Sequence, residues 1–328
     1  MPDPKPIGSV RSAAITVLVD NKADLIVESG ERVRYFTDAP LLAEHGFSAL
    51  IQLDDAQGRI LWDAGVSRVA LIENLHRMRI DPGAIEAIAL SHGHKDHYAA
   101  MTALLLERDY PPQEREWGPE LEPPTVEAWL AEARVPLVAH PAAFRERWWR
   151  KDDGTLVGPS LPAPVGAWEA LGARLVLSEG PYQLDPGCWT TGAIPRESFE
   201  ASGRSERLHY REGAGLHRDD LEEDQAIVIN VEGKGLLVLS GCAHSGIVNT
   251  VAYARERFGV ERVCAVIGGF HLARANDEEI EKTVAYIQSL EPLLVVPGHC
   301  TGLKAVRRFA QEMPEQFVEG VVGATYLL

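Results

Sequence analysis

The sequence has few cysteines, a shortage of basic residues and no long apolar run. Its four cysteines, among 328 residues, show no Cys-x-x-Cys spacing, which argues against both a disulfide framework and a cysteine zinc ribbon. The 32 Lys and Arg residues are outnumbered by 48 Asp and Glu residues, which gives a net charge of -16. This balance excludes a broad nucleic-acid surface and attraction to an anionic membrane.

No apolar stretch approaches the roughly 20 residues that a membrane-spanning helix needs. The opening residues MPDPKPIGSV contain neither the charged nor the apolar region of a signal peptide. We therefore expect a cytoplasmic protein without a membrane partner. Its hydrophobic fraction of 45% is enough to fill a sizeable core.

Alternating and helical apolar patterns divide the chain into strands and helices. We expect strands at 12–20, 47–53, 59–63, 85–90, 135–139, 173–178, 225–231, 235–240, 262–269 and 292–298. We expect helices at 66–78, 98–108, 141–149, 246–258, 277–290 and 303–313, and a loop or edge hairpin at 151–166. The order of these elements implies two sheets, or sheet halves, with helices on their outer faces.

Two stretches look like insertions. Residues 107–134 are acidic and proline-rich, with one short helix candidate at 125–133. Residues 195–223 are polar and charged, which suggests a long excursion over the surface or across the mouth of a cleft.

The stretch SHGHKDHYAA, residues 91–100, contains three histidines and an aspartate directly after an apolar strand. His92 and His94 are two residues apart, so on an extended segment their imidazoles project to the same side and can share a metal ion. Asp96 and His97 belong to the turn into the next helix and can reach a second ion. This loop follows the carboxyl end of a strand, where open α/β sheets usually bind ligands.

The H-x-H-x-D-H pattern of this loop resembles the signature of the metallo-β-lactamase superfamily. Over about residues 13 to 325, further stretches look like the branch that contains the archaeal dihydropterin ribofuranosylaminobenzene phosphate synthases: ITVLVDNKAD, EHGFSALI, ILWDAG, TTGAIPR, EDQAIVINVEGKGLLVLSGCAHSGIVNTV, VIGGFHL and HCTG. The resemblance implies an α/β fold, the four-layer αββα sandwich, in a single domain over 1–328. It also implies a mono- or dinuclear metal site at the sheet edges.

Three later histidines each follow a predicted strand: His244, His271 and His299. Three such positions beside a ready-made cluster favour metal binding over structural roles. The resemblance assigns His299 to the second metal, with Asp96 and His97. We expect His244 to complete the first metal site with His92 and His94.

One position departs from the superfamily pattern. Its bridging carboxylate normally stands in a Gly-Asp pair after a strand, and here the matching SGCAH offers Cys242. Cys242 could bind as a thiolate, His244 could take over the position, or the second metal could be held loosely. His271 could be a ligand, a proton donor or a substrate contact.

Other candidates have weaker support. Arg196 follows a strand-like segment and could bind a phosphate or carboxylate of the substrate, or could be an ordinary surface residue. Asp224 could orient a metal-bound histidine or cap a hairpin, and His140 could be structural or could support a ligand. We expect His45, His76, His209 and His217 in loops or on the surface.

The leading hypothesis is a metal-dependent hydrolase. Two divalent metal ions about 3.5 to 4 Å apart can share a hydroxide that attacks a small phosphoester or carboxyl-type substrate. Asp96 would position or deprotonate the nucleophile, and His271 would protonate the leaving group. The ligand types suit zinc first, with iron or manganese as alternatives.

Two other functions stay open. The branch resemblance implies a transferase that joins a pterin methyl group to a ribofuranosylaminobenzene phosphate, with pyrophosphate as leaving group. The missing bridging aspartate motivates a metal-binding or sensing module without turnover. In each case we expect a small-molecule partner, such as a phosphorylated or a pterin-like compound, and the oligomeric state is open.

Overall fold

The structure is a computed structural model that describes residues 5–54, 58–108, 122, 134–160, 162–201 and 205–328. The helix expected at 125–133 and most of the insertion at 107–134 lie outside these residues. No helix within the described ranges is both long enough and apolar enough to span a bilayer.

The first sheet has eight strands in the order β2-β18-β1-β3-β4-β5-β6-β9. Its strands are β1 (Ala13–Val19), β2 (Val33–Tyr35), β3 (Ser48–Leu53), β4 (Arg59–Trp62), β5 (Ile85–Ala89), β6 (Val135–Ala139), β9 (Ala173–Leu177) and β18 (Ala324–Leu327). β3 and β4 pair antiparallel, as expected for a hairpin, whereas β4, β5, β6 and β9 run parallel. The parallel half places the carboxyl ends of β4 and β5 at one edge.

The second sheet has six strands in the order β10-β11-β14-β15-β16-β17. They are β10 (Tyr182–Asp185), β11 (Cys188–Thr190), β14 (Ala226–Val231), β15 (Gly235–Ser240), β16 (Val263–Gly269) and β17 (Leu294–Gly298). β14 and β15 form the expected hairpin, and β15, β16 and β17 run parallel. The carboxyl ends of these three strands therefore lie side by side.

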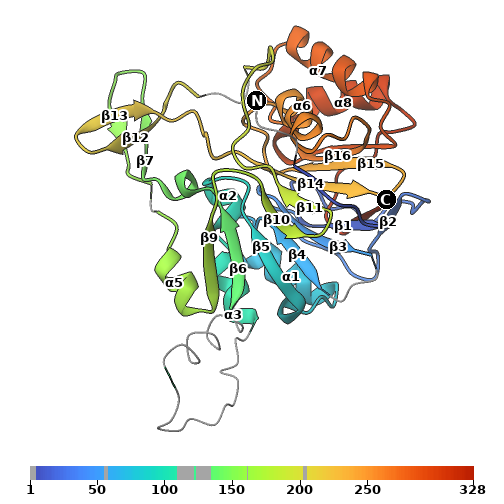
Figure 1. Cartoon of the computed structure of the whole chain (residues 1–328), viewed down its shortest axis with the longest axis horizontal. Coiled ribbons are helices and arrows are strands. Elements are labelled where there is room, and N and C mark those ends of the chain that lie inside the picture. The colour runs from blue at the N-terminus through green and yellow to red at the C-terminus, as the bar shows by residue number, and fades with distance from the viewer. Residues whose placement is uncertain (1–4, 55–57, 109–121, 123–133, 161, 202–204) are drawn as a thin grey trace.

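Helices cover the outer face of each sheet (Figure 1). On the first sheet lie α1 (Arg68–Arg77), α3 (Met101–Glu107) and α5 (Val165–Ala170), and on the second lie α6 (Ile247–Phe258), α7 (Asp277–Ser289) and α8 (Leu303–Glu312). Between the sheets a third core packs side chains such as Ile15, Trp62 and Ile227. Helix, sheet, sheet and helix layers form the expected αββα sandwich, because each sheet buries one apolar face against the other and one against its helices.

A small third sheet, which we call the flap, stands apart from the sandwich (Figure 1). It has the order β13-β12-β7-β8, from β7 (Arg147–Arg150), β8 (Leu156–Val157), β12 (Leu208–Glu212) and β13 (Gly215–Arg218). The insertion at 195–223 thus supplies a hairpin, and 151–166 supplies part of another. The helix expected at 141–149 is wrong: a short 3-10 turn, η2 (Pro141–Phe144), precedes β7. Pairing with β12 and burial of Trp148, with Trp149 on the opposite face, override the local helix preference.

Candidate metal centre

The predicted ligands converge from the strand ends of both sheets. The loop after β5 carries the first cluster and leads into the short helix α2 (Lys95–Tyr98), and the second sheet contributes residues after β15, β16 and β17. The residues brought together in this way are His92, His94, Asp96, His97, Cys242, His244, His271 and His299. One buried edge of the sandwich therefore gathers side chains that are more than 200 residues apart in the chain.

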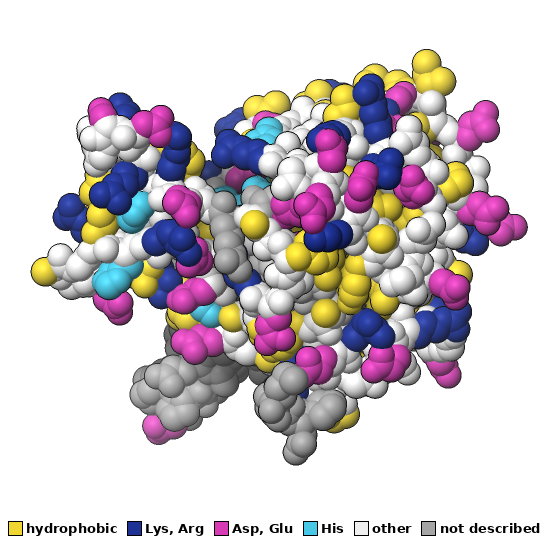
Figure 2. Space-filling model, turned by 90° about the horizontal axis from the view of Figure 1, so that it is seen from above, with side chains coloured by type: hydrophobic (Ala, Val, Ile, Leu, Met, Phe, Trp, Pro, Cys, Tyr) yellow, Lys and Arg dark blue, Asp and Glu magenta, His cyan; other side chains and the backbone are white. Residues whose placement is uncertain are grey.

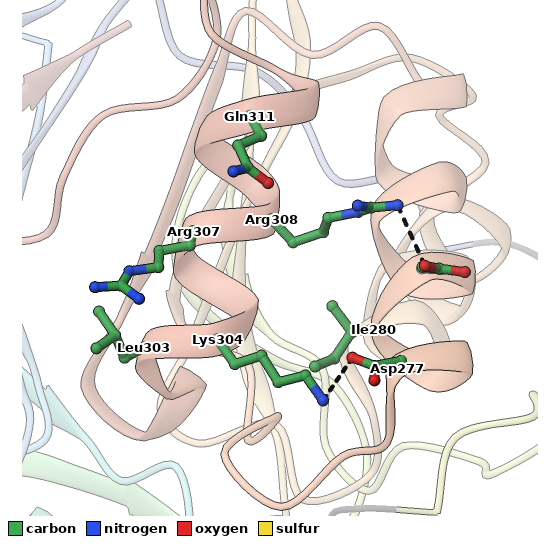
Figure 3. A pocket seen from close by; sticks show the side chains of 8 residues that line it. Asp277, Ile280, Leu303, Lys304, Arg307, Arg308 and Gln311 are labelled. Atoms are coloured by element: carbon green, nitrogen blue, oxygen red, sulfur yellow. Dashed lines mark hydrogen bonds and ion pairs between the residues drawn. The ribbon is translucent and has the colours of Figure 1, made fainter.

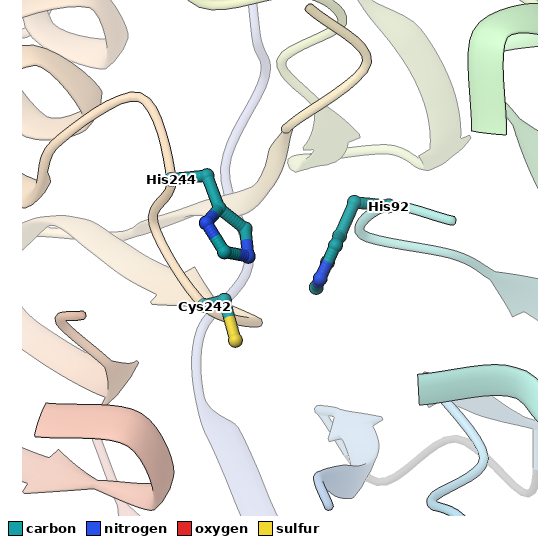
Figure 4. A group of neighbouring side chains, drawn as sticks. All are labelled: His92, Cys242 and His244. Atoms are coloured by element: carbon teal, nitrogen blue, oxygen red, sulfur yellow. The ribbon is translucent and has the colours of Figure 1, made fainter. Parts of the chain in front are cut away.

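A first group surrounds one point between the sheets. The ring centroid of His92 lies 4.6 Å from that of His94 and 4.7 Å from that of His244, and His94 and His244 are 4.8 Å apart. The donor atoms of His92, Cys242 and His244 lie within 4.8 Å of one another. Figure 4 shows the imidazoles of His244 and His92 on either side of a gap, with the sulfur of Cys242 below the His244 ring.

A second group lies beside the first. Asp96 Oδ2 lies 3.7 Å from His97 Nε2 and 3.5 Å from His299 Nε2. The donor atoms of His97, Cys242 and His299 also lie within 4.8 Å of one another. The two groups adjoin, because the ring centroids of His92 and His97 are 4.2 Å apart, so the structure brings the predicted residues to one place.

His271, which the sequence assigned to neither set, lies beside His244 of the first group. Its ring centroid lies 4.2 Å from that of His244, and its donor atom lies within 4.8 Å of the sulfurs of Cys242 and Cys300. His271 also borders the pocket above the cluster. This position is compatible with each of its three predicted roles.

Several imidazole nitrogens in this cluster point at no hydrogen-bond partner. Among the described residues, His92 Nε2, His271 Nδ1 and both ring nitrogens of His299 are buried without one. Burial lowers the pKa of His92, and it lowers the pKa of His94 and of His299 to about 4. These rings are neutral at pH 7 and keep a lone pair, which is the form that binds a cation, so the donors present fit a divalent metal.

Asp63, which was not among the residues predicted from the sequence, contacts His97 directly and His92 through Ser91. Its Oδ2 lies 2.6 Å from His97 Nδ1 and accepts a 2.7 Å hydrogen bond from Ser91 Oγ, which in turn lies 2.8 Å from His92 Nδ1. Burial opposes a charge on His97, but the Asp63 and Asp96 carboxylates outweigh it and raise its pKa to about 9. These contacts direct the Nε2 atoms of both histidines toward the centre.

Two further residues lie near His299: Asp20 was missed, whereas His45 is exposed in a loop, as expected. Asp20, at the end of β1, accepts from the His299 backbone N–H at 2.9 Å, and burial raises the pKa of Asp20 to about 7. His45, expected as a loop residue, stacks on the His299 ring at 5.2 Å and places Nε2 3.4 Å from Asp96 Oδ2. The stretches LVD and LWD, strands that end in an aspartate, were the available signal for Asp20 and Asp63.

The backbone of the site is strained. Asp63, Ala243, His271 and His299 all adopt positive φ angles between 45° and 58°. Non-glycine residues rarely adopt this conformation, which costs about 1 to 3 kcal/mol each. Such outliers cluster where the surrounding structure holds a side chain in one direction. Here they follow four strands and direct the side chains of these loops toward one centre.

The comparisons with known proteins agree with this geometry. A model of the metallo-beta-lactamase superfamily matches residues 42–175. A 7,8-dihydropterin-6-methyl-4-(beta-D-ribofuranosyl)-aminobenzene-5'-phosphate synthase from Methanocaldococcus jannaschii is 31% identical over 285 residues, which are 85% of this chain and 88% of that protein. The chain belongs to the metallo-beta-lactamase superfamily.

Solved structures agree on the superfamily fold. A metal-dependent hydrolase of the beta-lactamase superfamily matches with a TM-score of 0.69 and 22% identity, over 95% of this chain and 98% of that one. The metallo-beta-lactamase fold protein YhfI from Bacillus subtilis matches with a TM-score of 0.50 and 12% identity, over 97% and 100% of the two chains. At these identities the likeness establishes the fold and leaves the reaction open.

In this metallo-beta-lactamase fold a pocket of about 430 Å³ opens above the histidines. Its walls include Trp149 and Leu208 of the flap, Arg274 after β16, and Leu221. Figure 2 shows the flap as a separate lobe that carries Lys and Arg side chains. The insertion at 195–223 therefore does contribute to the mouth of the cleft, as expected.

The remaining sequence candidates lie around this pocket. Arg196 is not among the described residues that line it; its guanidinium donates to the carbonyl oxygens of Asp220 and Leu221 and so holds the pocket wall. Asp224 accepts from the backbone N–H of Ser245 at 2.7 Å, which fixes the loop that carries His244. His140 accepts from Ala142 N at 3.1 Å and caps η2.

A second groove, of about 490 Å³, lies between α7 and α8 (Figure 3). Four of its charged side chains form two ion pairs, with Lys304 at 2.5 Å from Asp277 and Arg308 at 3.3 Å from Glu281. Among the described residues, its lining includes no histidine or cysteine. The described part of the groove therefore lacks the imidazole and thiol donors of the histidine pocket.

Proposed function

We propose that the protein is a metal-dependent hydrolase that acts on a small phosphoester or carboxyl-type substrate. Two divalent ions, most simply zinc, would be held by His92, His94 and His244 on one side and by Asp96, His97 and His299 on the other. The observation that carries this proposal is the convergence of buried imidazoles with unpartnered nitrogens at the base of a pocket. Buried polar atoms normally have partners, so this arrangement implies a ligand.

Two metal ions held by these residues would lower the pKa of water and polarise the bond under attack. The residues of the chain would then hold the ions, orient the attacking water and transfer protons. The Asp96 carboxylate, within 3.7 Å of the imidazoles of His45, His97 and His299, is placed to orient the attacking water and accept its proton. His271, on the pocket wall, is placed to protonate the leaving group.

Replacement of both His92 and His94 by alanine tests this proposal. We expect the wild-type protein to bind close to two ions per chain and the variant to bind fewer. We also expect its hydrolysis of chromogenic phosphoesters and carboxyl esters to fall to background. The matched control replaces His76 and His217, which are exposed, and should retain both properties. Full activity in the His92 and His94 variant would contradict the proposal, and a single, fully coordinated ion in the wild type would favour the non-catalytic module instead.

The second candidate is a transferase that forms a bond between a pterin methyl group and an aminobenzene ring. The 31% identity to a synthase of this description favours it. The pocket wall adds support, because Trp149 and Leu208 offer an apolar surface for a flat ring and Arg274 a positive charge for a phosphate. Incubation with a hydroxymethyl-dihydropterin diphosphate tests it: release of pyrophosphate must depend on the aryl acceptor.

The single-domain organisation and the cytoplasmic location stay predictions.

A further inference from the structure

Cys242 is the one residue shared by every cluster of candidate metal donors that the described residues form. Its sulfur groups with His92 and His244, with His97 and His299, and with His271 and Cys300, in each case within 4.8 Å. It is buried and lies 3.2 Å from His97 Nε2. The sulfur therefore lies between the two imidazole sets rather than on one side of them.

We propose that Cys242 is the bridging ligand of a dinuclear centre and that it binds as a thiolate. This inference rests on the proposed metal site and adds to it the identity of the shared donor. On metal binding the S–H bond would break, its electron pair would stay on sulfur and the proton would leave to solvent. Two different lone pairs of the resulting thiolate would then bind the two ions. The bridge would supply the negative charge that a carboxylate supplies elsewhere in the superfamily.

The dimensions permit such a bridge. Metal–thiolate bonds are about 2.3 Å long, so two of them span at most roughly 4.6 Å, which exceeds the separation of about 3.5 to 4 Å in dinuclear sites. The turn that carries Cys242 is also built for close approach. A Cβ on Gly241 would collide with Ser91 Oγ and would lie 2.8 Å from Asp63 Oδ2, and Ala243 has a φ of 54°. This tight turn aims Cys242 and His244 into the same centre.

A bridging sulfur restricts the metal. Thiolates favour zinc, iron and cobalt over magnesium and manganese, which prefer oxygen ligands. Cys300 offers a second sulfur nearby, and its Sγ lies 3.4 Å from the Cys242 carbonyl oxygen. Among the groups of described donor atoms, however, Cys300 shares a group with one histidine only, His271. Cys300 is therefore the appropriate comparison in a test of which sulfur bridges.

The test is absorption spectroscopy of the full chain loaded with Co²⁺. We expect visible d–d bands together with a near-ultraviolet sulfur-to-cobalt charge-transfer band that grows with both the first and the second equivalent of Co²⁺. Growth with one equivalent only would show a terminal thiolate and overturn the bridge. Cys242→Ser should lose the charge-transfer band, and Cys242→Asp should lose it while still binding two cobalt ions. Cys300→Ser, and the remote core variant Cys188→Ser, should both keep it.

The possible outcomes distinguish failure of the bridging thiolate from failure of the proposed metal centre. Cobalt binding without a charge-transfer band, or a band that survives in Cys242→Asp or disappears in Cys300→Ser, overturns the bridging thiolate and leaves the hydrolase proposal standing. Failure of the wild-type protein to bind cobalt at all overturns the metal centre itself. Mn²⁺ should displace Co²⁺ from Cys242→Asp more readily than from wild type, and equal displacement would also count against the bridge.

Discussion

Two buried polar clusters meet at Gly93 and differ in how their polar atoms are satisfied. In the first, every nitrogen of the Arg147 guanidinium has an acceptor, including Asp219 at 2.7 Å and Glu223 at 2.5 Å. In the second, imidazole nitrogens of His92 and other histidines lack a partner among the described residues. The Gly93 N–H joins the clusters by donating to Glu223 Oε1 at 3.2 Å.

The difference lies in how each cluster treats its central groups: all three Arg147 nitrogens have acceptors, although Glu223 Oε2 in the same cluster has no partner among the described residues. The Arg147 cluster ties η2, β7 and the loop before β14 into one unit, and a Cβ at Gly93 would collide with the Ala143 carbonyl oxygen. The histidine cluster instead carries backbone strain and unused lone pairs. The first is therefore a support that fixes the metal loop, and the second needs a ligand to be complete.

Removal of Arg147 should give the largest loss of stability. Arg147→Ala leaves Asp219 and Glu223 buried without their cation, which we expect to cost about 3 to 5 kcal/mol of unfolding free energy. Urea unfolding of the metal-free protein measures this loss. Arg150→Ala, on the exposed end of the same strand, should stay within about 0.5 kcal/mol. Similar losses in both variants would show that the Arg147 cluster is not a special support.

Asp63 tests the link between support and ligand. Asp63→Asn weakens the contact to His97 Nδ1, and we expect metal affinity to fall about 10- to 100-fold. Chelator competition with zinc measures the change. The control is Asp152→Asn, whose carboxylate pairs with Arg207 on the exposed flap and should leave affinity unchanged. Unaltered affinity in Asp63→Asn would remove Asp63 from the centre.

The same aspartate predicts a pH dependence of the metal-free protein. The pKa of His97 is raised from 6.5 to about 9 in the folded state, so protonated His97 stabilises the fold fully below pH 6.5, and this contribution is lost as pH rises toward 9. We expect stability to fall by about 1 to 2 kcal/mol between pH 7 and 9. Asp20, whose pKa is raised to about 7, has lost most of its contribution at the start of this range. Chemical unfolding with chelator present should show the slope in wild type and a much smaller one in Asp63→Asn.

The sequence predicted the parts of the site that depend on local pattern. The loop SHGHKDHYAA follows a strand, and the later histidines end strands of a regular α/β alternation, so topology alone placed them at one edge. Asp63 was missed because its partner His97 lies 34 residues further along the chain. His45 was correctly expected in a loop or on the surface, but its contact with Asp96, 51 residues further on, was not foreseen. A strand that ends in aspartate has many local explanations until the fold shows what faces it.

The fold was predicted least well where pairing is non-local. β2, three residues long, becomes a strand because it pairs with β18 at the other end of the chain. In the flap, β7 pairs with β12 about 60 residues later, and this contact turned a predicted helix into a strand. Local propensity is a weak guide at such positions, since cross-strand contacts decide the outcome.

Loss of an exposed ion pair in the groove between α7 and α8 should have the smallest effect on stability. Arg308 pairs with Glu281 at 3.3 Å, but the two side chains are 39% and 58% exposed. Water and salt screen an exposed pair, so Arg308→Gln should change the unfolding free energy by less than about 1 kcal/mol, and added salt should shrink the difference further. Thermal unfolding at low and high salt measures this, with metal content as a second readout. A loss comparable to that of Arg147→Ala, or a loss of bound metal, would mean that burial does not separate the supporting charges of this protein from its surface charges.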